Sequence, residues 1–167
     1  MADEELAKQL SETYARERDG ALELFEDTVE VLEELKPRYP LGLITNGPAD
    51  IQRQEIETLG IGRYIDHVFI EGEMRFGKPE PEVFRRAEAA VGFSGPEILF
   101  VGNSFAHDIR PAIEAGWRSA WIRRPTDVPP SAAPGGSPVE QAPEGAPEPD
   151  VVIGELRELL PLLTAGS

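Results

Sequence analysis

Short apolar runs alternate with helical segments along most of the chain, and several of the helical segments end at a glycine. The runs have the length and composition of buried strands, and they cover residues 41–45, 68–70, 98–101, 119–122 and 151–153. Helical segments between them stop at Gly60, Gly92 and Gly116, the residue type that most often closes a helix. Strands that alternate with helices of about three turns form βαβ units. The pattern therefore predicts an α/β fold with a parallel sheet covered by helices on both faces.

Two more helices are predicted in the amino-terminal part of the chain. Apolar residues recur at helical spacing among charged ones in residues 3–18, which indicates an amphipathic helix. A second helix begins with Asp27 or Thr28 as its N-cap, because Asp27 and Glu30 have the spacing of a capping box. Pro37 ends this helix.

Residues 125–149 differ in composition from the rest of the chain. This segment holds 8 of the 16 prolines, no Lys or Arg, and almost no large apolar side chain. It cannot bury enough apolar surface to offset the entropy lost on ordering, so we expect a disordered acidic linker with few contacts. A regulatory segment is the alternative. Residues 150–167 then form a terminal strand and a leucine-rich helix.

The charge balance and the absence of cysteine narrow the possible functions. A formal net charge of −15 repels a phosphate backbone, so nucleic acid is not an expected partner. The absence of Cys excludes disulfides and cysteine nucleophiles, and it is compatible with a reducing cytosol. The first residues lack the features of a secretory signal, and no apolar run approaches the roughly 20 residues needed to span a bilayer. These features predict a cytoplasmic protein without a membrane partner.

Polar residues follow two of the predicted strands at their carboxyl ends, where doubly wound sheets bind ligands. Thr45, Asn46 and Gly47 supply a hydroxyl and the backbone N–H groups of a turn that enters a helix, which together can hold phosphate oxygens. Lys78 follows the next strand and supplies a compact positive charge. Taken singly, these are an ordinary Asn-Gly turn and a solvated loop lysine. Their position after successive strands favours a phosphate site.

A third polar cluster, residues 101–108, joins the strand at 98–101 to a helix. Asn103 and Asp108 offer the hard oxygen ligands that suit a Mg²⁺ ion, which keeps several waters and is completed by a substrate phosphate. Considered alone, Asp108 is more simply a helix N-cap. The order of hydroxyl, lysine and acidic loop along three strands favours the metal site.

These three clusters together resemble the haloacid dehalogenase superfamily of phosphohydrolases. The resemblance covers nearly the whole chain, through segments 24–32, 42–47, 76–84, 101–109, 115–116 and 149–150. It implies a Rossmann-like α/β core at 21–124 that is completed by residues 150–167. It also implies that residues 1–20 are a remnant of a helical cap.

The resemblance assigns roles to single residues. Thr45 and Lys78 hold the phosphate group with Asn46 as a supporting contact, and Asn103 and Asp108 hold Mg²⁺, so that Lys78 and Asp108 are the catalytic residues. Members of the superfamily usually have two acids around the metal. Asn103 replaces the first acid here, which removes one negative charge and predicts weaker metal binding.

One feature of the superfamily is missing from this sequence. Its first motif is a central strand that ends in Asp-x-Asp, where the first Asp attacks phosphorus and the second is a general acid and base. Asp19 is the only superficial candidate, and no apolar run precedes it. The resemblance thus implies an amino-terminal truncation that removes the strand between the one ending at Thr45 and the one ending at Gly102. Two strand edges are then open, unless these strands pair with each other or another chain supplies the missing strand.

The expected function is hydrolysis of small phosphate monoesters at a Mg²⁺-dependent site that is incomplete in this chain. A pseudoenzyme that binds phosphorylated metabolites or a protein partner is the alternative. Dehalogenase activity is disfavoured, because Lys78 with Thr45 is the phosphate-type arrangement. The sequence identifies neither the substrate nor the oligomeric state.

Overall fold

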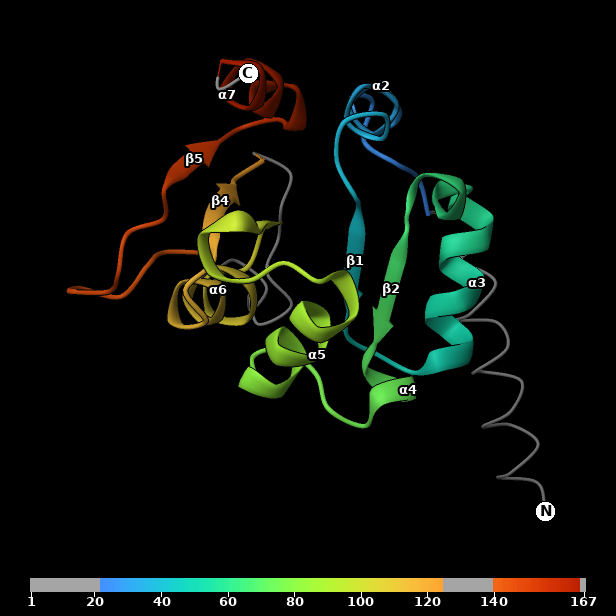
Figure 1. Ribbon diagram of the computed structural model, residues 1–167, viewed down its shortest axis with the longest axis horizontal. Coiled ribbons are helices and arrows are strands. Elements are labelled where there is room, and N and C mark those ends of the chain that lie inside the picture. Colours follow the sequence, from blue (N-terminus) through green and yellow to red (C-terminus); the bar gives the residue numbers. More distant parts are fainter. Residues whose placement is uncertain (1–21, 125–139, 166–167) are drawn as a thin grey trace, which may run out of the picture.

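The computed structural model describes residues 22–124 and 140–165, and it has an α/β fold (Figure 1). In chain order the elements are α2 (Thr28–Leu35), β1 (Gly42–Thr45), α3 (Ala49–Leu59), η1 (Ile61–Tyr64), β2 (His67–Ile70), α4 (Glu71–Met74), α5 (Pro81–Val91), η2 (Gly95–Glu97), β3 (Leu99–Gly102), the π-helical turn η3 (Phe105–Ile109), α6 (Arg110–Glu114), β4 (Arg118–Ile122), β5 (Val151–Ile153), η4 (Leu156–Glu158) and α7 (Leu159–Thr164). The helix predicted at residues 3–18 lies outside the described residues.

The predicted strands are confirmed, and each differs from its predicted range by at most one residue at either end. The three glycines predicted to end helices all have positive φ, with values of 65° at Gly60, 77° at Gly92 and 81° at Gly116. This left-handed conformation costs an L-amino acid with a side chain more than it costs glycine. The glycine spacing therefore correctly marked where the helices end.

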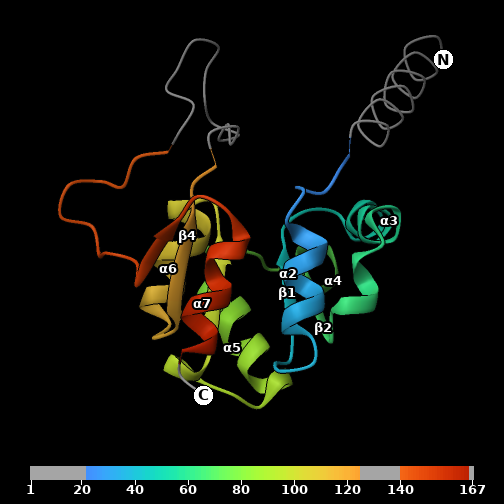
Figure 2. The same ribbon diagram turned by 90° about the horizontal axis from the view of Figure 1, so that it is seen from above.

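All strand pairs are parallel, but the strands form two sheets. β1 pairs with β2, and β3, β4 and β5 form a second sheet in that order. Figures 1 and 2 show the two sheets in two halves of the molecule, with α3 beside the first and α6 beside the second. Within the described residues, β1 and β3 each have a strand partner on one side only. The sequence predicted two open edges unless β1 and β3 paired, and these two strands do not pair.

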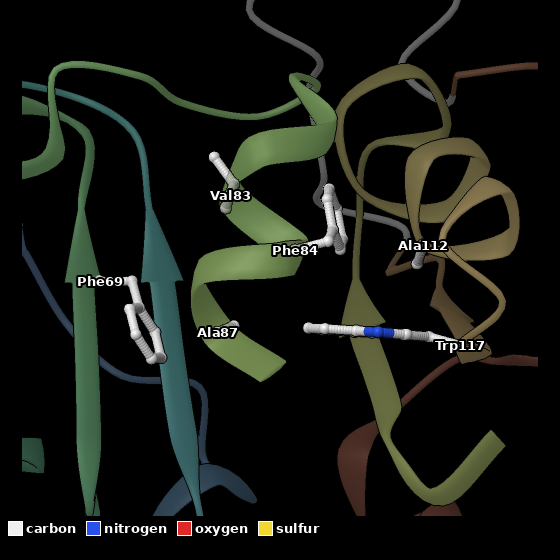
Figure 3. Close-up of a cluster of buried hydrophobic side chains, with 6 residues drawn as sticks. All are labelled: Phe69, Val83, Phe84, Ala87, Ala112 and Trp117. Atoms are coloured by element: carbon white, nitrogen blue, oxygen red, sulfur yellow. The ribbon is translucent and has the colours of Figure 1, made fainter. Parts of the chain in front are cut away.

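Helix α5 connects the two halves through a buried aromatic cluster (Figure 3). Its residue Val83 faces the first sheet, where Phe69 lies on β2, and Phe84 faces Trp117 at the second sheet. The ring centroids of Phe84 and Trp117 are 5.0 Å apart in an edge-to-face arrangement, a favoured geometry for aromatic pairs. The Trp117 Nε1–H also donates to the Glu88 carboxylate of α5 over 2.8 Å. This cluster joins the two sheets without any strand pairing between them.

The N-cap position predicted for Asp27 is confirmed, but the predicted capping box with Glu30 does not form. Asp27 precedes α2, but its side chain makes no cap hydrogen bond and is only 2% exposed. Its carboxylate accepts from Arg124 Nη2 at 2.9 Å and from the backbone N–H groups of Leu156 at 2.5 Å and Arg157 at 3.3 Å. A buried charged partner and two amides thus replace the local cap. Asp27 connects the start of α2 to the end of β4 and to η4.

The described part of the proline-rich segment, residues 140–149, contains no helix or strand. It nevertheless contacts the core. Ala146 packs against a cluster that contains Phe105 and Trp121, and the Glu140 side chain bonds to the backbone of η3. In the part of the chain that the structure describes, no helix has the length and apolarity to cross a membrane.

Candidate active site

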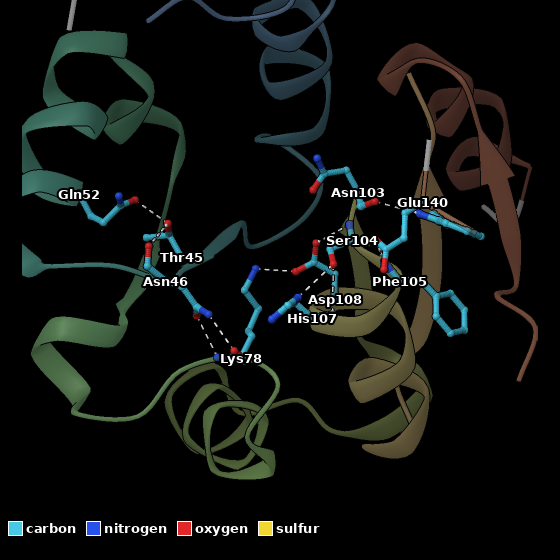
Figure 4. A network of polar contacts seen from close by, with 11 residues as sticks. Thr45, Asn46, Gln52, Lys78, Asn103, Ser104, Phe105, His107, Asp108 and Glu140 are labelled. Carbon is cyan, nitrogen blue, oxygen red and sulfur yellow. Dashed lines mark hydrogen bonds and ion pairs between the residues drawn. The ribbon is translucent and has the colours of Figure 1, made fainter. Parts of the chain in front are cut away.

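Lys78 and Asp108 form a partly buried ion pair at the centre of the candidate site (Figure 4). Lys78 Nζ lies 2.5 Å from Asp108 Oδ1, and the two side chains are 14% and 6% exposed. Lys78 belongs to the loop between α4 and α5, and Asp108 to η3 after β3. The structure thus brings together the second and third polar clusters of the sequence. Their catalytic roles remain predictions.

The turn after β3 places the Asp108 carboxylate against the strand end. The Ser104 N–H donates to Asp108 Oδ2 over 3.0 Å. A Cβ atom at Gly102 would overlap the Asp108 side chain, so glycine is needed for this close approach. The short π-helical turn therefore aims a carboxylate from η3 back at the carboxyl end of β3.

Asn46 holds the backbone of Lys78 through both ends of its side-chain amide. Its Nδ2 donates to the Lys78 carbonyl oxygen over 2.7 Å, and its Oδ1 accepts from the Lys78 N–H over 2.9 Å. These two bonds fix the lysine loop to the end of β1. The sequence predicted Asn46 as a supporting phosphate contact, and that role remains a prediction. The contact that the structure contains is the one to Lys78.

Thr45 is the last residue of β1 and directly precedes Asn46 (Figure 4). Its Oγ1 donates to Gln52 Oε1 over 2.6 Å. The predicted phosphate-binding hydroxyl is therefore held by the first turns of α3. Gln52 was not predictable as a site residue, because a polar residue on a helix gives no signal of which strand end it faces.

Glu71 is a further residue of the site that the sequence analysis missed. Its Oε2 accepts from the Gly47 N–H over 2.8 Å, and a Cβ atom at Gly77 would lie 2.7 Å from its Cδ. The Gly72 N–H also donates to the Gly47 carbonyl over 3.0 Å. Glu71 thus packs between the Asn-Gly turn and the lysine loop. An acid directly after β2 occupies the same kind of strand-end position as Thr45 after β1, and that position was the available signal.

Asn103 and Asp108 are the candidate metal ligands. Asn103 is exposed at the end of β3, and its backbone carbonyl accepts from Trp121 Nε1 over 3.0 Å. Among the described residues, no three His, Cys, Asp or Glu side chains gather where they could hold a metal ion. One carboxylate and one amide oxygen fit Mg²⁺ in chemistry, because Mg²⁺ takes hard oxygen ligands and usually keeps several waters.

The chain has an α/β fold, and a lysine and a carboxylate pair beyond its strand ends. These features define a Rossmann-like protein, a class that binds ligands at this edge of the sheet. A family model described as haloacid dehalogenase-like hydrolase matches residues 2–116, and a second HAD-hydrolase-like model matches residues 75–159. The first match covers more than half of the chain. The chain belongs to the haloacid dehalogenase-like hydrolases.

Curated relatives of the chain include phosphatases. Phosphoserine phosphatase of Thermus thermophilus is 35% identical over 156 residues, which cover 93% of this chain and 57% of the relative. N-acylneuraminate-9-phosphatase of Homo sapiens is 31% identical over 134 residues, which cover 80% of this chain and 54% of the relative. The chain thus spans about half the length of the curated relatives that it matches.

Solved structures support the same family. A HAD phosphatase from Thermococcus onnurineus matches with a TM-score of 0.69 and 28% identity, over 84% of this chain and 58% of that one. A 2-haloacid dehalogenase from Pseudomonas syringae matches with a TM-score of 0.74 and 27% identity, over 100% of this chain and 65% of that one. The fold of the chain is therefore shared by phosphatases and dehalogenases.

The two bonds of Asn46 lead to a prediction about stability. Asn46→Ala is expected to lower the free energy of unfolding by about 1–3 kcal/mol, because it leaves the Lys78 N–H and carbonyl without their partners. Urea denaturation measures this difference. Asn103→Ala is the control, since it truncates an exposed amide and should change the value by less than about 0.5 kcal/mol. Equal effects of the two substitutions would contradict the proposed bracing of Lys78.

Proposed function

We propose that this site binds the phosphate group of small phosphate monoesters and belongs to a Mg²⁺-dependent phosphohydrolase. The single observation that carries the proposal is the partly buried Lys78–Asp108 pair beyond the strand ends, held in place by Asn46. The named relatives support it, because they are a phosphoserine phosphatase and an N-acylneuraminate-9-phosphatase.

Each residue of the site has a role in this proposal. The Lys78 ammonium and the Thr45 hydroxyl bind phosphate oxygens, with Asn46 holding the lysine loop. Asp108 and Asn103 supply the protein oxygens for Mg²⁺, which neutralises phosphate charge when bound. The ion pair places the Lys78 ammonium beside the Asp108 carboxylate. In the proposal, a phosphate on Lys78 would therefore lie next to a Mg²⁺ ion held by Asp108.

We further propose that the chain, as printed, binds phosphate without hydrolysing it. No apolar strand ending in Asp-x-Asp is present in the sequence. Both oxygens of Asp108 have partners, Lys78 and the Ser104 N–H. The same observations favour a second candidate function, a pseudoenzyme that retains an anion pocket for a phosphorylated metabolite or a protein partner. A cytoplasmic location is proposed from composition alone.

Binding of inorganic phosphate tests the shared part of both candidates. Lys78→Ala is expected to weaken phosphate binding at least about tenfold in the presence of Mg²⁺, because it removes the cation of the site. Isothermal titration calorimetry measures the dissociation constant. Lys36→Ala is a matched control, since Lys36 forms a surface pair with Asp66 and its loss changes the net charge equally. If the two variants bound phosphate equally well, the proposed anion site would be wrong.

A further inference from the structure

The Glu140 carboxylate binds two consecutive backbone amides of the turn that carries Asp108. Its Oε2 accepts from the Phe105 N–H over 2.9 Å, and its Oε1 accepts from the Ala106 N–H over 3.1 Å (Figure 4). Glu140 is 34 and 35 residues away from these partners in the sequence, in the proline-rich segment. A side chain from that segment therefore reaches the candidate metal site.

These two bonds complete the hydrogen bonding of the first turn after β3. The first N–H groups of a helix have no partner within the helix itself. Here the Ser104 N–H donates to Asp108 over 3.0 Å, and the His107 N–H donates to Ser104 Oγ over 3.3 Å. Helical bonding starts with the Asp108 N–H, which donates to the Ser104 carbonyl over 2.9 Å. The N–H groups of Phe105 and Ala106 donate to Glu140. Glu140 therefore accepts from two of the four N–H groups at positions 104 to 107 that precede the first helical bond.

The backbone of Glu140 is also held in place. Arg123 Nη2 donates to the Glu140 carbonyl over 3.3 Å, and the Arg123 guanidinium lies 4.6 Å from the centre of the Trp121 ring. The Trp121 Nε1–H donates to the Asn103 carbonyl, and its ring centroid is 5.3 Å from that of Phe105. Glu140 is thus part of a connected set of contacts that includes Asn103 before the turn and Phe105 at its start.

We propose that Glu140 is a positioning residue of the candidate metal site. Its two charge-assisted hydrogen bonds hold the Phe105–Ala106 backbone, and this backbone sets the direction of Asp108 and Asn103. Loss of the carboxylate leaves two amides without acceptors, which favours a rearrangement of the turn. Asp108 then loses its orientation toward Lys78. The part of this inference that concerns Mg²⁺ rests on the proposed function.

The test compares Glu140→Gln with Glu144→Gln in the whole chain. Glutamine at position 140 keeps one acceptor, but its NH₂ group faces the second amide donor. Glu144 is exposed in the same segment, so its substitution removes the same charge away from the turn. Amide hydrogen exchange, followed by NMR at Ser104, Phe105 and Ala106, reports on the turn without metal. Calorimetry with Mg²⁺ reports on the ligand oxygens.

For Glu140→Gln we expect exchange at least tenfold faster at Phe105, Ala106 and also Ser104, whose N–H reports the orientation of Asp108. Mg²⁺ binding should weaken at least tenfold, while Glu144→Gln changes neither measurement by more than twofold. Faster exchange at Phe105 and Ala106 alone would overturn the inference, because Glu140 would then be a local cap. Unchanged Mg²⁺ affinity in Glu140→Gln would also overturn it. If the wild-type chain bound no Mg²⁺, the metal part of the proposed function would fail, and the Ser104 result would still decide the role of Glu140.

Discussion

Protein spanning residues 1–167 is expected to hydrolyse p-nitrophenyl phosphate no faster than its Lys78→Ala variant, even with Mg²⁺ present. Loss of the covalent nucleophile of a catalytic unit costs on the order of 10⁶ in turnover when the rest of the site is intact. In the proposed site Thr45 and Lys78 bind the phosphate but carry no carboxylate, and both oxygens of Asp108 already accept hydrogen bonds. Release of p-nitrophenolate measures the difference.

The complementary experiment supplies the missing group. Coexpression with an amino-terminal segment of a full-length relative that carries the Asp-x-Asp strand is expected to restore turnover. That activity should fall again when Thr45, Lys78 or Asp108 is replaced by Ala. Robust Lys78-dependent turnover by residues 1–167 alone would show that another carboxylate reaches phosphorus, and the proposed incomplete site would be wrong.

Asp27→Ala is expected to lower the free energy of unfolding by about 3–5 kcal/mol, because it removes a buried carboxylate that binds the Arg124 guanidinium and two backbone amides. The Asp27 and Arg124 side chains are 3% and 11% exposed, and Asp27 also accepts from two backbone amides of η4. Urea denaturation measures the effect. Glu82→Ala serves as the control, since Glu82 forms an exposed pair with Arg85 and its loss should cost less than about 1 kcal/mol.

The stabilisation by Asp27 should also depend on pH. Burial raises the pKa of the Asp27 carboxyl, but the hydrogen bond and charge of Arg124 and the two η4 amides outweigh burial and hold this pKa below its ordinary value of 3.8. The unfolded chain therefore binds the proton more readily than the folded one. The stabilisation is fully present above pH 3.8 and is lost as the pH falls through the lower pKa of the folded state. A stability difference between wild type and Asp27→Asn that stayed constant over this range would contradict this assignment.

The regular elements were predictable because their signals are local. Strand lengths, helical spacing and the glycines at positions 60, 92 and 116 act within a few residues, and the structure agrees with them. Asp27 occupies the N-cap position that its local signal predicted, but the partners of its side chain were not predictable in this way. Its local spacing to Glu30 suggested a cap, whereas its partners are 97 and 129 residues away, at Arg124 and Leu156. Sequence spacing gives no information about such contacts.

Some residues of the candidate site were predictable from the sequence, and others were not. Lys78 and Asp108 could be placed near each other because parallel strands end at one edge of a sheet, although the strands here lie in two sheets. The bracing residues could not be placed. Asn46 was expected to support a phosphate contact, which stays a prediction, and its two bonds to the Lys78 backbone were not foreseen. Glu140 lies in a segment whose composition predicted few contacts, and the two backbone N–H groups that donate to it are brought together only by the folded turn.

Within residues 22–124 and 140–165, β1 and β3 each have an open edge, and such edges affect how copies of this chain behave in solution. An unpaired strand edge presents backbone donors and acceptors that can add a strand from any neighbouring molecule. The net charge of −15 opposes such encounters, because two copies repel each other at long range. At physiological ionic strength this repulsion is screened beyond about 8 Å. Raising the ionic strength to this level shortens the range of the repulsion, so separate molecules approach one another more readily and the colloidal stability of the chain falls.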